Sequence, residues 1–529
     1  MNVINHLGDE VMKVFRVCGW AQIRHRPRAH ASNIVSDSGI AYSNVTYSSV
    51  TYSIVTNLLM SRPLYGRRRE LRALEQAWTS GKPELLIAAG RRRSGKSYLL
   101  THVLAERRGF YYQATKGTSR EQLARVSGAV GVQFPDSRVD LAGGFRDWES
   151  FFEFIVVEAA GQPFLLILDE VPYLLDAIRG FGSVLQAVWD HRLADSQIKL
   201  VLSGSYISAM HRLTAADQPL HGRRTVSLPF LPFSYRDAAS FMAQYPPRDQ
   251  LIGYAAFGGL PGQLSLIDPT LSIVKNIETH LIDPVGRLSD EGERLLDAFL
   301  REAGVHYAIV RAVASGEHKW SKITSRVGKD SASLSRPLDW LLDMDILERV
   351  IPATDTPPGN PKKAKYRVAD PYLSFWHRFV APLRATGANE IREPAELWEQ
   401  MIAPRLNEHM GPVFEAACRT FVAAGEHHRL PFRPVRVGEW WSNDSTNEVD
   451  VVALGPDGEV LIGECKWGSV SRGDLATLSE RRDMVVKELR GVTRVHLALF
   501  SGAPVIDPVV AQQIASGDVL HFPIDDLYA

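Results

Sequence analysis

Short apolar runs alternate with longer amphipathic stretches between residues 63 and 268 of this 529-residue chain. The stretches 97–108 and 181–195 have the spacing of amphipathic helices. The apolar runs, each bounded by Gly, Pro or polar residues, read as five strands: 84–90, 109–115, 164–170, 199–205 and 225–230. Buried strands that alternate with helices predict an α/β domain whose parallel sheet is covered on both faces.

A different pattern follows in residues 269–370, which read as mostly helical. Helix candidates begin at Val310, Lys322 and Ser331, and the last of them is expected to run to Val350. Two strand-like pieces, starting at Leu347 and Ala364, flank a loop rich in Pro, Gly and Lys. This order predicts a winged helix-turn-helix with Ser331–Val350 as its recognition helix.

Residues 371–529 begin helical and aromatic and then alternate strand and helix again, which predicts a second α/β domain. Residues 1–60 differ from the rest because their repeated Ser/Thr/Tyr/Val unit has neither helical nor strand-turn patterning. We expect a poorly ordered extension there, with Met60 as an alternative beginning. The expected divisions are therefore 1–60, 61–268, 269–370 and 371–529.

Composition limits the classes of protein to consider. Apolar residues make up 45% and charged residues 23%, which is typical of a soluble globular protein. The 60 basic and 60 acidic residues cancel, and a neutral total neither supports nor excludes nucleic acid. Three scattered cysteines favour a reducing compartment over a disulfide framework. No apolar run approaches the roughly 18 residues of a membrane span, and the start lacks a secretory pattern, so we expect a cytoplasmic protein without a membrane partner.

The segment Gly90-Arg91-Arg92-Arg93-Ser94-Gly95-Lys96-Ser97 matches the phosphate-binding pattern GxxxxGK[ST]. It follows a predicted strand and opens a predicted helix that continues through Tyr98, whereas a simple glycine turn would need neither element. The glycines let backbone N–H groups point at the phosphates, and the helix start adds partial positive charge. We expect this segment with Tyr98 to bind ATP, Lys96 to reach the β- and γ-phosphates, and Ser97 to ligate Mg²⁺.

Further polar residues follow the neighbouring strands. Asp169 is expected to hold Mg²⁺ through water, and Glu170 to polarise the attacking water. Ser203 and Ser205 end the next strand, and either one could sense the γ-phosphate, with a plain turn as the alternative. Arg223 is a candidate to reach transition-state charge in cis or in trans, with a surface salt bridge as the alternative.

A set of segments carries a resemblance to a known family: Pro63-LYGRRREL, GRRRSGKS, LILDEVPYLL, LVLSGS, the Gly222-Arg223 step, Pro229-FLPFSYRDA and Gly258-GLPGQL. On these segments the chain resembles the prokaryotic, largely archaeal-type P-loop ATPases of the AAA/STAND superfamily. The resemblance implies ATP and Mg²⁺ as cofactors, a motor or switch, and a helical lid that begins near Gly258. The family's Gly-Arg-Glu near the start, which helps to position adenine, reads Gly66-Arg67-Arg68 here.

The winged-helix candidate, residues 305–369, carries eleven Lys/Arg and seven Asp/Glu, a net charge of +4. A DNA-binding role would use the exposed amino-terminal side of the recognition helix and phosphate contacts from the wing, through Ser333, Ser335, Arg336, Lys362, Lys363 and Lys365. Acidic residues on the same helix would repel phosphate: Asp339, Asp343 and Asp345. An interdomain role is therefore the alternative, and DNA stays open as a partner.

A second candidate site lies near the carboxyl end of the chain. Alternation places Glu448 and Asp450 on one strand face, and Glu464 and Lys466 on one face of the next strand, across a hairpin turn at 455–458. Asp450 and Glu464 can hold Mg²⁺, while Lys466 orients water and stabilises negative charge. Glu415, in a helix expected to open at Gly411, is a further candidate for the metal shell.

This pattern resembles the PD-(D/E)xK restriction-endonuclease-like fold. It is also similar to the domain of unknown function that is commonly fused to this ATPase family, preceded here by Asp370-Pro-Tyr-Leu-Ser-Phe-Trp. The resemblance implies Asp450, Glu464 and Lys466 as a catalytic trio. Three functions stay open: an ATP-regulated nuclease, a nucleotide-dependent switch or scaffold that forms homo-oligomers and whose nuclease-like domain is inactive and only binds, and a DNA-binding regulator.

Overall fold

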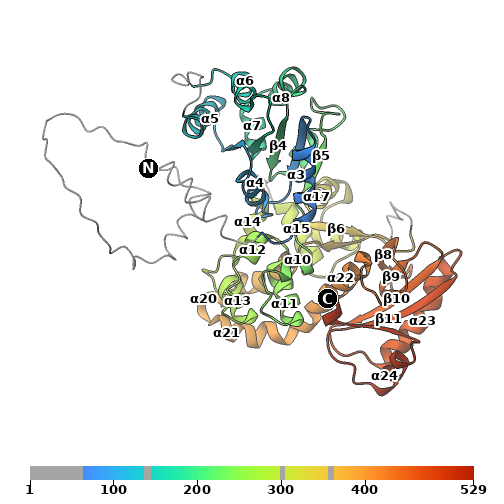
Figure 1. Cartoon of the computed structure of the whole chain (residues 1–529). Helices are drawn as coiled ribbons and strands as arrows, with labels where there is room; N and C mark the ends of the chain where they lie inside the picture. Colours follow the sequence, from blue (N-terminus) through green and yellow to red (C-terminus); the bar gives the residue numbers. More distant parts are fainter. Residues whose placement is uncertain (1–63, 136–143, 298–303, 356–362) are drawn as a thin grey trace, which may run out of the picture.

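The structure is a computed structural model that describes residues 64–135, 144–297, 304–355 and 363–529. The extension expected at 1–60 and the wing residue Lys362 lie outside these ranges. A parallel-sheet domain and a mixed-sheet domain lie at two ends of the molecule, with a largely helical region between them (Figure 1). Among the described residues, no helix combines the length and the apolar character needed to cross a membrane.

The amino-terminal domain is built on a five-stranded sheet in which all paired strands are parallel, in the order β2-β3-β4-β1-β5. The strands are β1 (Glu84–Ala89), β2 (Gly109–Gln113), β3 (Phe164–Asp169), β4 (Ile198–Gly204) and β5 (Val226–Pro229). These are the five predicted strands, so the α/β fold class of a P-loop NTPase is confirmed. Because the strands are parallel, all their carboxyl ends meet at one edge of the sheet, which is where ligands bind in such sheets.

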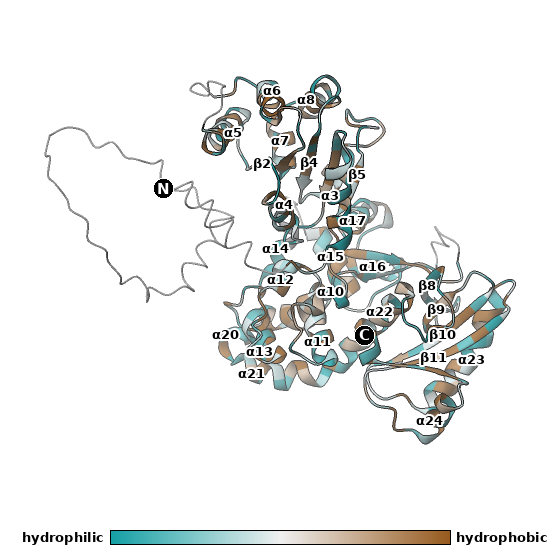
Figure 2. Ribbon diagram, in the orientation of Figure 1, coloured by the Kyte–Doolittle hydropathy of each residue, from teal (hydrophilic) through white to brown (hydrophobic). Residues whose placement is uncertain are grey.

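Helices cover both faces of this sheet. The three central strands β3, β4 and β1 are buried along their whole length. Their residues are mostly apolar, and Figure 2 colours apolar residues brown. Leu86 and Ala88 of β1 pack against α3 (Arg68–Thr79) and α4 (Lys96–Leu104). Leu85 and Ile87 point to the other core, which is built from helices α5 (Ser119–Gln133), α6 (Trp148–Ala159), α7 (Val171–Ala177) and α8 (Phe181–Val188). Alternate residues of β1 therefore contribute to the two hydrophobic cores, one on each face of the sheet.

The central region contains a lid-like group of short helices and then three helices followed by an antiparallel hairpin. The lid helices are α10 (Tyr235–Ala239), α11 (Pro247–Phe257), α12 (Pro261–Leu264) and α13 (Ile273–Ile277). The later elements are α15 (Gly304–Ala314), α16 (Trp320–Val327), α17 (Ser331–Asp343), β6 (Leu347–Val350) and β7 (Lys365–Val368). The expected recognition helix to Val350 is too long, because Asp345 adopts a left-handed φ of 52° that ends α17, and β6 follows.

The hairpin does not present its lysines as predicted. Lys365 is only 6% exposed, and its ammonium lies 2.5 Å from Glu448 and 4.3 Å from the centre of the Trp441 ring. Lys363 is 3.6 Å from Asp355 and is only partly exposed. The wing lysines in the described part of the chain therefore face carboxylates and the C-terminal domain, which corrects the expectation of a phosphate-binding wing.

One continuous core joins the lid, the three-helix region and the helices up to residue 402. It includes Phe257 and Leu281 from the lid region, Leu341 from α17, and Trp376 and Trp398 from beyond residue 371. Helix α18 (Pro371–Phe375) packs along α11. The packing therefore does not divide at the expected boundary of 371, and residues 371–402 belong with the central region.

The C-terminal domain is a five-stranded mixed sheet in the order β12-β11-β10-β9-β8. Its strands are β8 (Arg436–Trp441), β9 (Glu448–Leu454), β10 (Glu459–Lys466), β11 (Arg494–Ser501) and β12 (Leu520–Pro523). One face packs on α22 (Ala403–Ala424), and the other packs on α23 (Arg472–Glu488) and α24 (Pro508–Ala515). The second α/β domain and its 455–458 hairpin turn are confirmed. Glu415 lies inside α22, so the expected helix start at Gly411 is wrong: Pro404 occupies the first turn, and Pro412 is accommodated within the helix.

Candidate functional site

The loop between β1 and α4 folds closely around its glycines. A Cβ built on Gly90 would lie 2.5 Å from the Phe230 carbonyl oxygen, so only glycine fits there. Gly95 has φ +85°, which favours glycine and begins α4 at Lys96. Backbone approach and a left-handed turn are what a phosphate-binding loop requires before a helix amino terminus.

Lys96 lies at the centre of this loop and is almost fully buried. Its ammonium donates to the Gly90 carbonyl at 2.7 Å, to the Arg91 carbonyl at 3.2 Å and to the Ser205 hydroxyl at 3.0 Å. Burial lowers the pKa of Lys96, and the carboxylates of Glu170 and Asp169 oppose that effect. The lysine is therefore held beside both acids at the carboxyl edge of the sheet.

Ser97 and Asp169 form a ready pair of oxygen ligands. The Ser97 hydroxyl donates to Asp169 Oδ2 at 2.5 Å, and the Tyr111 hydroxyl donates to the same oxygen at 2.7 Å. Burial and the charge of Asp169 raise the pKa of Tyr111, which keeps this phenol protonated as a donor. A hydroxyl and a carboxylate side by side are the hard oxygen donors that Mg²⁺ prefers, so these residues fit the expected metal.

Glu170 is held in a conformation that non-glycine residues rarely adopt, with φ 53°. Its carboxylate accepts hydrogen bonds from the Ser205 hydroxyl at 2.6 Å and from the Ser205 N–H at 3.3 Å. Ser205 thus connects Lys96 to Glu170. The other sensor candidate, Ser203, makes neither contact. Ser203 is fully buried, and its hydroxyl has no hydrogen-bond partner among the described residues.

The arginines of the loop contact other parts of the chain. Arg91 donates to Asp370 at 2.8 Å, and both side chains are almost completely buried. Arg93 lies 3.4 Å from Glu291, and its carbonyl accepts from the Gly262 N–H at 3.1 Å. Arg92 is exposed, and the Tyr98 ring stacks against His102 one helical turn on. Arg91 and Arg93, expected as nucleotide ligands, therefore fasten the loop to the central region through their side chains.

The C-terminal candidates also come together. Antiparallel pairing of β9 with β10 sets Val451 opposite Gly463, so Asp450 and Glu464 are neighbours one residue further along. Asp450 Oδ2 accepts from the Cys465 N–H at 2.8 Å, and the Lys466 ammonium lies 2.8 Å from Glu464 Oε1. Further charges complete the cluster in contacts that the sequence did not predict: Asp474 at 3.4 Å from Lys466, Arg481 at 3.5 Å from Glu464, and Arg419, which donates to the Asp450 carbonyl at 2.9 Å.

The acids of this cluster disfavour one another's charge. Burial raises the pKa of Asp450 well above its usual range, and repulsion from Glu415 and Glu464 adds to the rise. Burial also raises the pKa of Glu415, against the opposing effect of Arg419 and Arg367. Within the described ranges, no group of three or more His, Cys, Asp or Glu is arranged to hold a metal ion. Asp450 and Glu464 therefore offer two carboxylate ligands, without a third residue of these types in place.

Comparison with known proteins agrees with the amino-terminal geometry. Residues 64–267 match an ATPase domain predominantly from Archaea. Residues 376–478 match Archaea bacterial proteins of unknown function. The chain is similar to the uncharacterized protein MJECL04 of Methanocaldococcus jannaschii, at 26% identity over 77% of this chain and 88% of that protein.

Solved structures similar to this chain include two archaeal proteins. The Walker-type ATPase PABY2304 of Pyrococcus abyssi is 20% identical, covers 60% of this chain and 99% of its own, and has a TM-score of 0.43. The ORC2 protein of Aeropyrum pernix is 13% identical, covers 62% of this chain and 98% of its own, and has a TM-score of 0.42.

Arg67, the middle residue of the Gly66-Arg67-Arg68 segment, makes a contact with the phosphate loop that the motif analysis did not predict. Its guanidinium donates to the Ser94 carbonyl of the phosphate loop at 2.7 Å and to Glu70 at 2.9 Å, and it lies 4.4 Å from the centre of the Phe233 ring. Glu70, three residues on, is the acid that pairs with Arg67. The sequence signal for this pair is the Arg-x-x-Glu spacing across the start of α3.

Arg223 lies near the amino ends of the ATPase strands, away from the phosphate loop. It forms two hydrogen bonds of 2.7 Å to Asp190, and it precedes β5 near Thr225, whose N–H donates to the Leu85 carbonyl at the start of β1. Five residues of strand separate Leu85 from Gly90, roughly 15 Å. The structure therefore does not bring Arg223 to Lys96 within one chain, which corrects the prediction in cis and leaves the prediction in trans.

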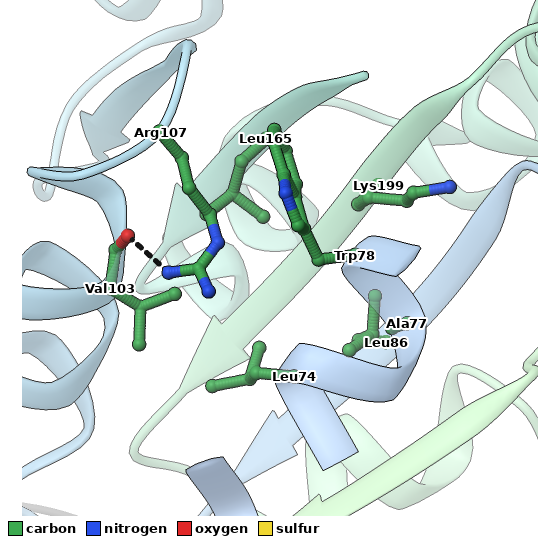
Figure 3. A pocket seen from close by; sticks show the side chains of 8 residues that line it. All are labelled: Leu74, Ala77, Trp78, Leu86, Val103, Arg107, Leu165 and Lys199. Carbon is green, nitrogen blue, oxygen red and sulfur yellow. Dashed lines mark hydrogen bonds between the residues drawn. The ribbon is translucent and has the colours of Figure 1, made fainter. Parts of the chain in front are cut away.

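A small cavity also lies away from the candidate site. Figure 3 shows it between α3 and the sheet, with Trp78, Leu165 and Lys199 on its wall and Arg107 donating to the Val103 carbonyl at 2.8 Å. Leu165 and Lys199 are the second residues of β3 and β4. The cavity therefore lies toward the amino ends of the strands, on the side away from the phosphate loop.

Proposed function

We propose that residues 64–267 bind ATP with Mg²⁺ and hydrolyse it, and that this reaction switches the state of the rest of the chain, as in an AAA/STAND-type ATPase. The hydrogen-bonded series Lys96–Ser205–Glu170, beside the pair Ser97–Asp169, carries the proposal. An ammonium group, two hydroxyls and two carboxylates lie together at the carboxyl edge of the sheet, which supports binding of phosphate and Mg²⁺ and activation of water.

Each residue has a separate task. The loop N–H groups and Lys96 bind the phosphates, and Ser97 with Asp169 would hold Mg²⁺, which supplies charge neutralisation when bound. Glu170 accepts the proton of the attacking water. Ser205, which already contacts both Lys96 and Glu170, is the residue that reports the presence of the γ-phosphate to the base.

A comparison of two glutamate variants tests the hydrolytic assignment. Glu170→Gln should retain ATP binding and lose steady-state hydrolysis, because the amide cannot take the proton. Glu153→Gln is the matched control, since Glu153 is an exposed glutamate of the same domain that pairs with Arg192. Equal hydrolysis by the two variants would show that Glu170 is not the base.

A second candidate function is cleavage of DNA by the C-terminal cluster with a divalent cation. It is favoured because Asp450, Glu464 and Lys466 lie close together on adjacent strands. Two carboxylates that could bind the metal are thus found beside the lysine ammonium group. DNA should be cut with Mg²⁺ by the intact chain and not by Lys466→Met. Lys487→Met, at an exposed lysine of α23, is the control. If the intact chain leaves DNA uncut both with and without ATP, the nuclease function is contradicted and the domain is an inactive binding module.

The switch also predicts nucleotide-dependent homo-oligomers in which Arg223 of one copy reaches the ATP of another. Equal molecular masses with ADP and with a non-hydrolysable ATP analogue would contradict that part of the proposal. Light scattering at matched protein concentrations makes the comparison.

A further inference from the structure

The carboxyl end of helix α11 lies against a residue that is bonded to the phosphate loop. Gly258 caps the helix, and a Cβ built there would lie 2.7 Å from Asp370 Oδ1. Asp370 uses its other oxygen to accept the hydrogen bond from Arg91, at 2.8 Å. The loop that encloses the phosphates is thus connected to the end of α11 through one buried ion pair.

The amino end of the same helix lies against the C-terminal domain. Arg248, in the first turn of α11, donates to the carbonyl of Trp467 and to that of Gly502, at 2.9 Å each. Its guanidinium also lies 3.9 Å from the centre of the Trp467 ring. Trp467 directly follows Lys466 on β10, and Gly502 directly follows the end of β11 and donates to the Lys466 carbonyl at 2.8 Å.

Helix α11 is buried in two cores at once between its fifth and its last residue. Leu251 and Ala255 pack with the residues of α22 and of the mixed sheet. Ala256 and Phe257 belong to the core of the central region. A helix of this length spans about 16 Å. Because packed interiors resist deformation, a displacement at one end of such a helix is carried to the other end.

We propose that α11 transmits the nucleotide state of the phosphate loop to the carboxylate–lysine cluster, and that Arg248 is the positioning residue at the receiving end. This inference rests on the proposed ATP function. When the loop closes on the phosphates, Arg91 moves with it, and Asp370 and Gly258 follow. Arg248 then shifts the ends of β10 and β11, between which Lys466 is held.

Hydrogen exchange of the full chain, measured by mass spectrometry with and without ATP and Mg²⁺, tests the proposal. Peptides covering 84–97 report binding, and peptides covering 460–468 and 499–503 report transmission. We expect protection in the first peptide and a change of about fivefold or more in the exchange rates of the other two, the lower end of measured allosteric couplings.

Two substitutions separate transmission from simple docking. Arg248→Met keeps an apolar stem against Trp467 but loses both carbonyl contacts, so the nucleotide-dependent change at 460–468 and 499–503 should disappear while protection at 84–97 persists. Arg248→Lys should restore part of the change. Arg236→Met is the control, because Arg236 also crosses to the C-terminal domain, donating to the Leu527 carbonyl at 2.7 Å, but from α10. The control should leave the nucleotide-dependent change intact.

The outcomes are distinguishable. Protection at 84–97 with no change in the other two peptides of the unmodified chain would overturn the coupling and leave the ATP function standing. A change that survives in Arg248→Met, or is lost equally in Arg236→Met, would overturn the role of Arg248 and α11. No protection at 84–97 would overturn the ATP function itself, and the coupling with it.

Discussion

The buried pair Arg91–Asp370 permits a test in which charge alone is removed. The two side chains are 4% and 2% exposed, and their atoms lie 2.8 Å apart. Asp370 also caps α18 by accepting from the Tyr372 N–H at 3.0 Å. Asparagine keeps an oxygen for that cap. Asp370→Asn therefore leaves the helix cap in place while Arg91 loses its counter-charge.

The expected cost follows from the burial. Removing one partner of a buried ion pair costs about 3–5 kcal/mol, since the remaining charge stays without a partner in a low dielectric. Replacing the cap itself would add about 1 kcal/mol, which asparagine avoids. In Arg91→Met/Asp370→Asn no charge is left buried. The double variant should therefore lose several kcal/mol less free energy of unfolding than the two single variants lose together.

Hydrogen exchange of the most protected amides of β1 and α18 measures this directly, because it yields local opening free energies without assuming that a multidomain chain unfolds in one step. The four proteins of the cycle are compared under the same conditions. A loss below about 0.5 kcal/mol for Asp370→Asn is the size expected of a surface change, and it would refute the buried-pair reasoning. Strict additivity in the double variant would refute it as well.

Three further outcomes follow from the geometry. Ser97→Ala should make ATP binding less dependent on Mg²⁺ in calorimetric titrations and slow hydrolysis by at least about tenfold, or ~1.4 kcal/mol. The folded pKa of Asp450 is raised, so the folded chain retains a proton that the unfolded chain releases, and stability falls as pH rises from about 4 through the folded pKa. Asp450→Asn should therefore gain melting temperature relative to the unmodified chain at pH 8 and gain less at pH 5. Arg223→Met should abolish any rise of ATPase rate per chain with protein concentration, while the loss of its exposed pair with Asp190 should leave the melting temperature nearly unchanged, because exposed ion pairs contribute little to stability.

The parallel sheet could be predicted because its signals are local. Five short apolar runs, each closed by Gly, Pro or polar residues, became β1 to β5. The meeting of Lys96, Asp169 and Glu170 also followed, because parallel strands share their carboxyl edge. The choice between Ser203 and Ser205 could not be made, since both precede the same turn. It depends on side-chain direction at the strand end, where only Ser205 reaches Glu170.

Arginines and lysines were the least predictable residues. Three arginines inside a phosphate loop indicate anion binding, yet Arg91 meets a carboxylate 279 residues away and Arg93 meets Glu291. The charge pattern along the chain does not show whether an arginine binds a phosphate or a distant carboxylate. The same limit explains Arg67, whose partners are a loop carbonyl and Glu70.

The two interpretations of residues 305–369 can now be compared by the free energy that each would cost. Phosphate contact by the wing would require the hairpin to leave the C-terminal domain, which would separate Arg367 from Glu439, 2.5 Å apart with Glu439 only 7% exposed, and Lys365 from Glu448. Breaking one buried pair of this kind costs about 3–5 kcal/mol. By contrast, the amino-terminal side of α17 is exposed at Ser333 and Arg336 without any rearrangement. The hairpin is therefore better explained as an interdomain contact. Any DNA contact from this region would be made by the exposed residues at the start of α17.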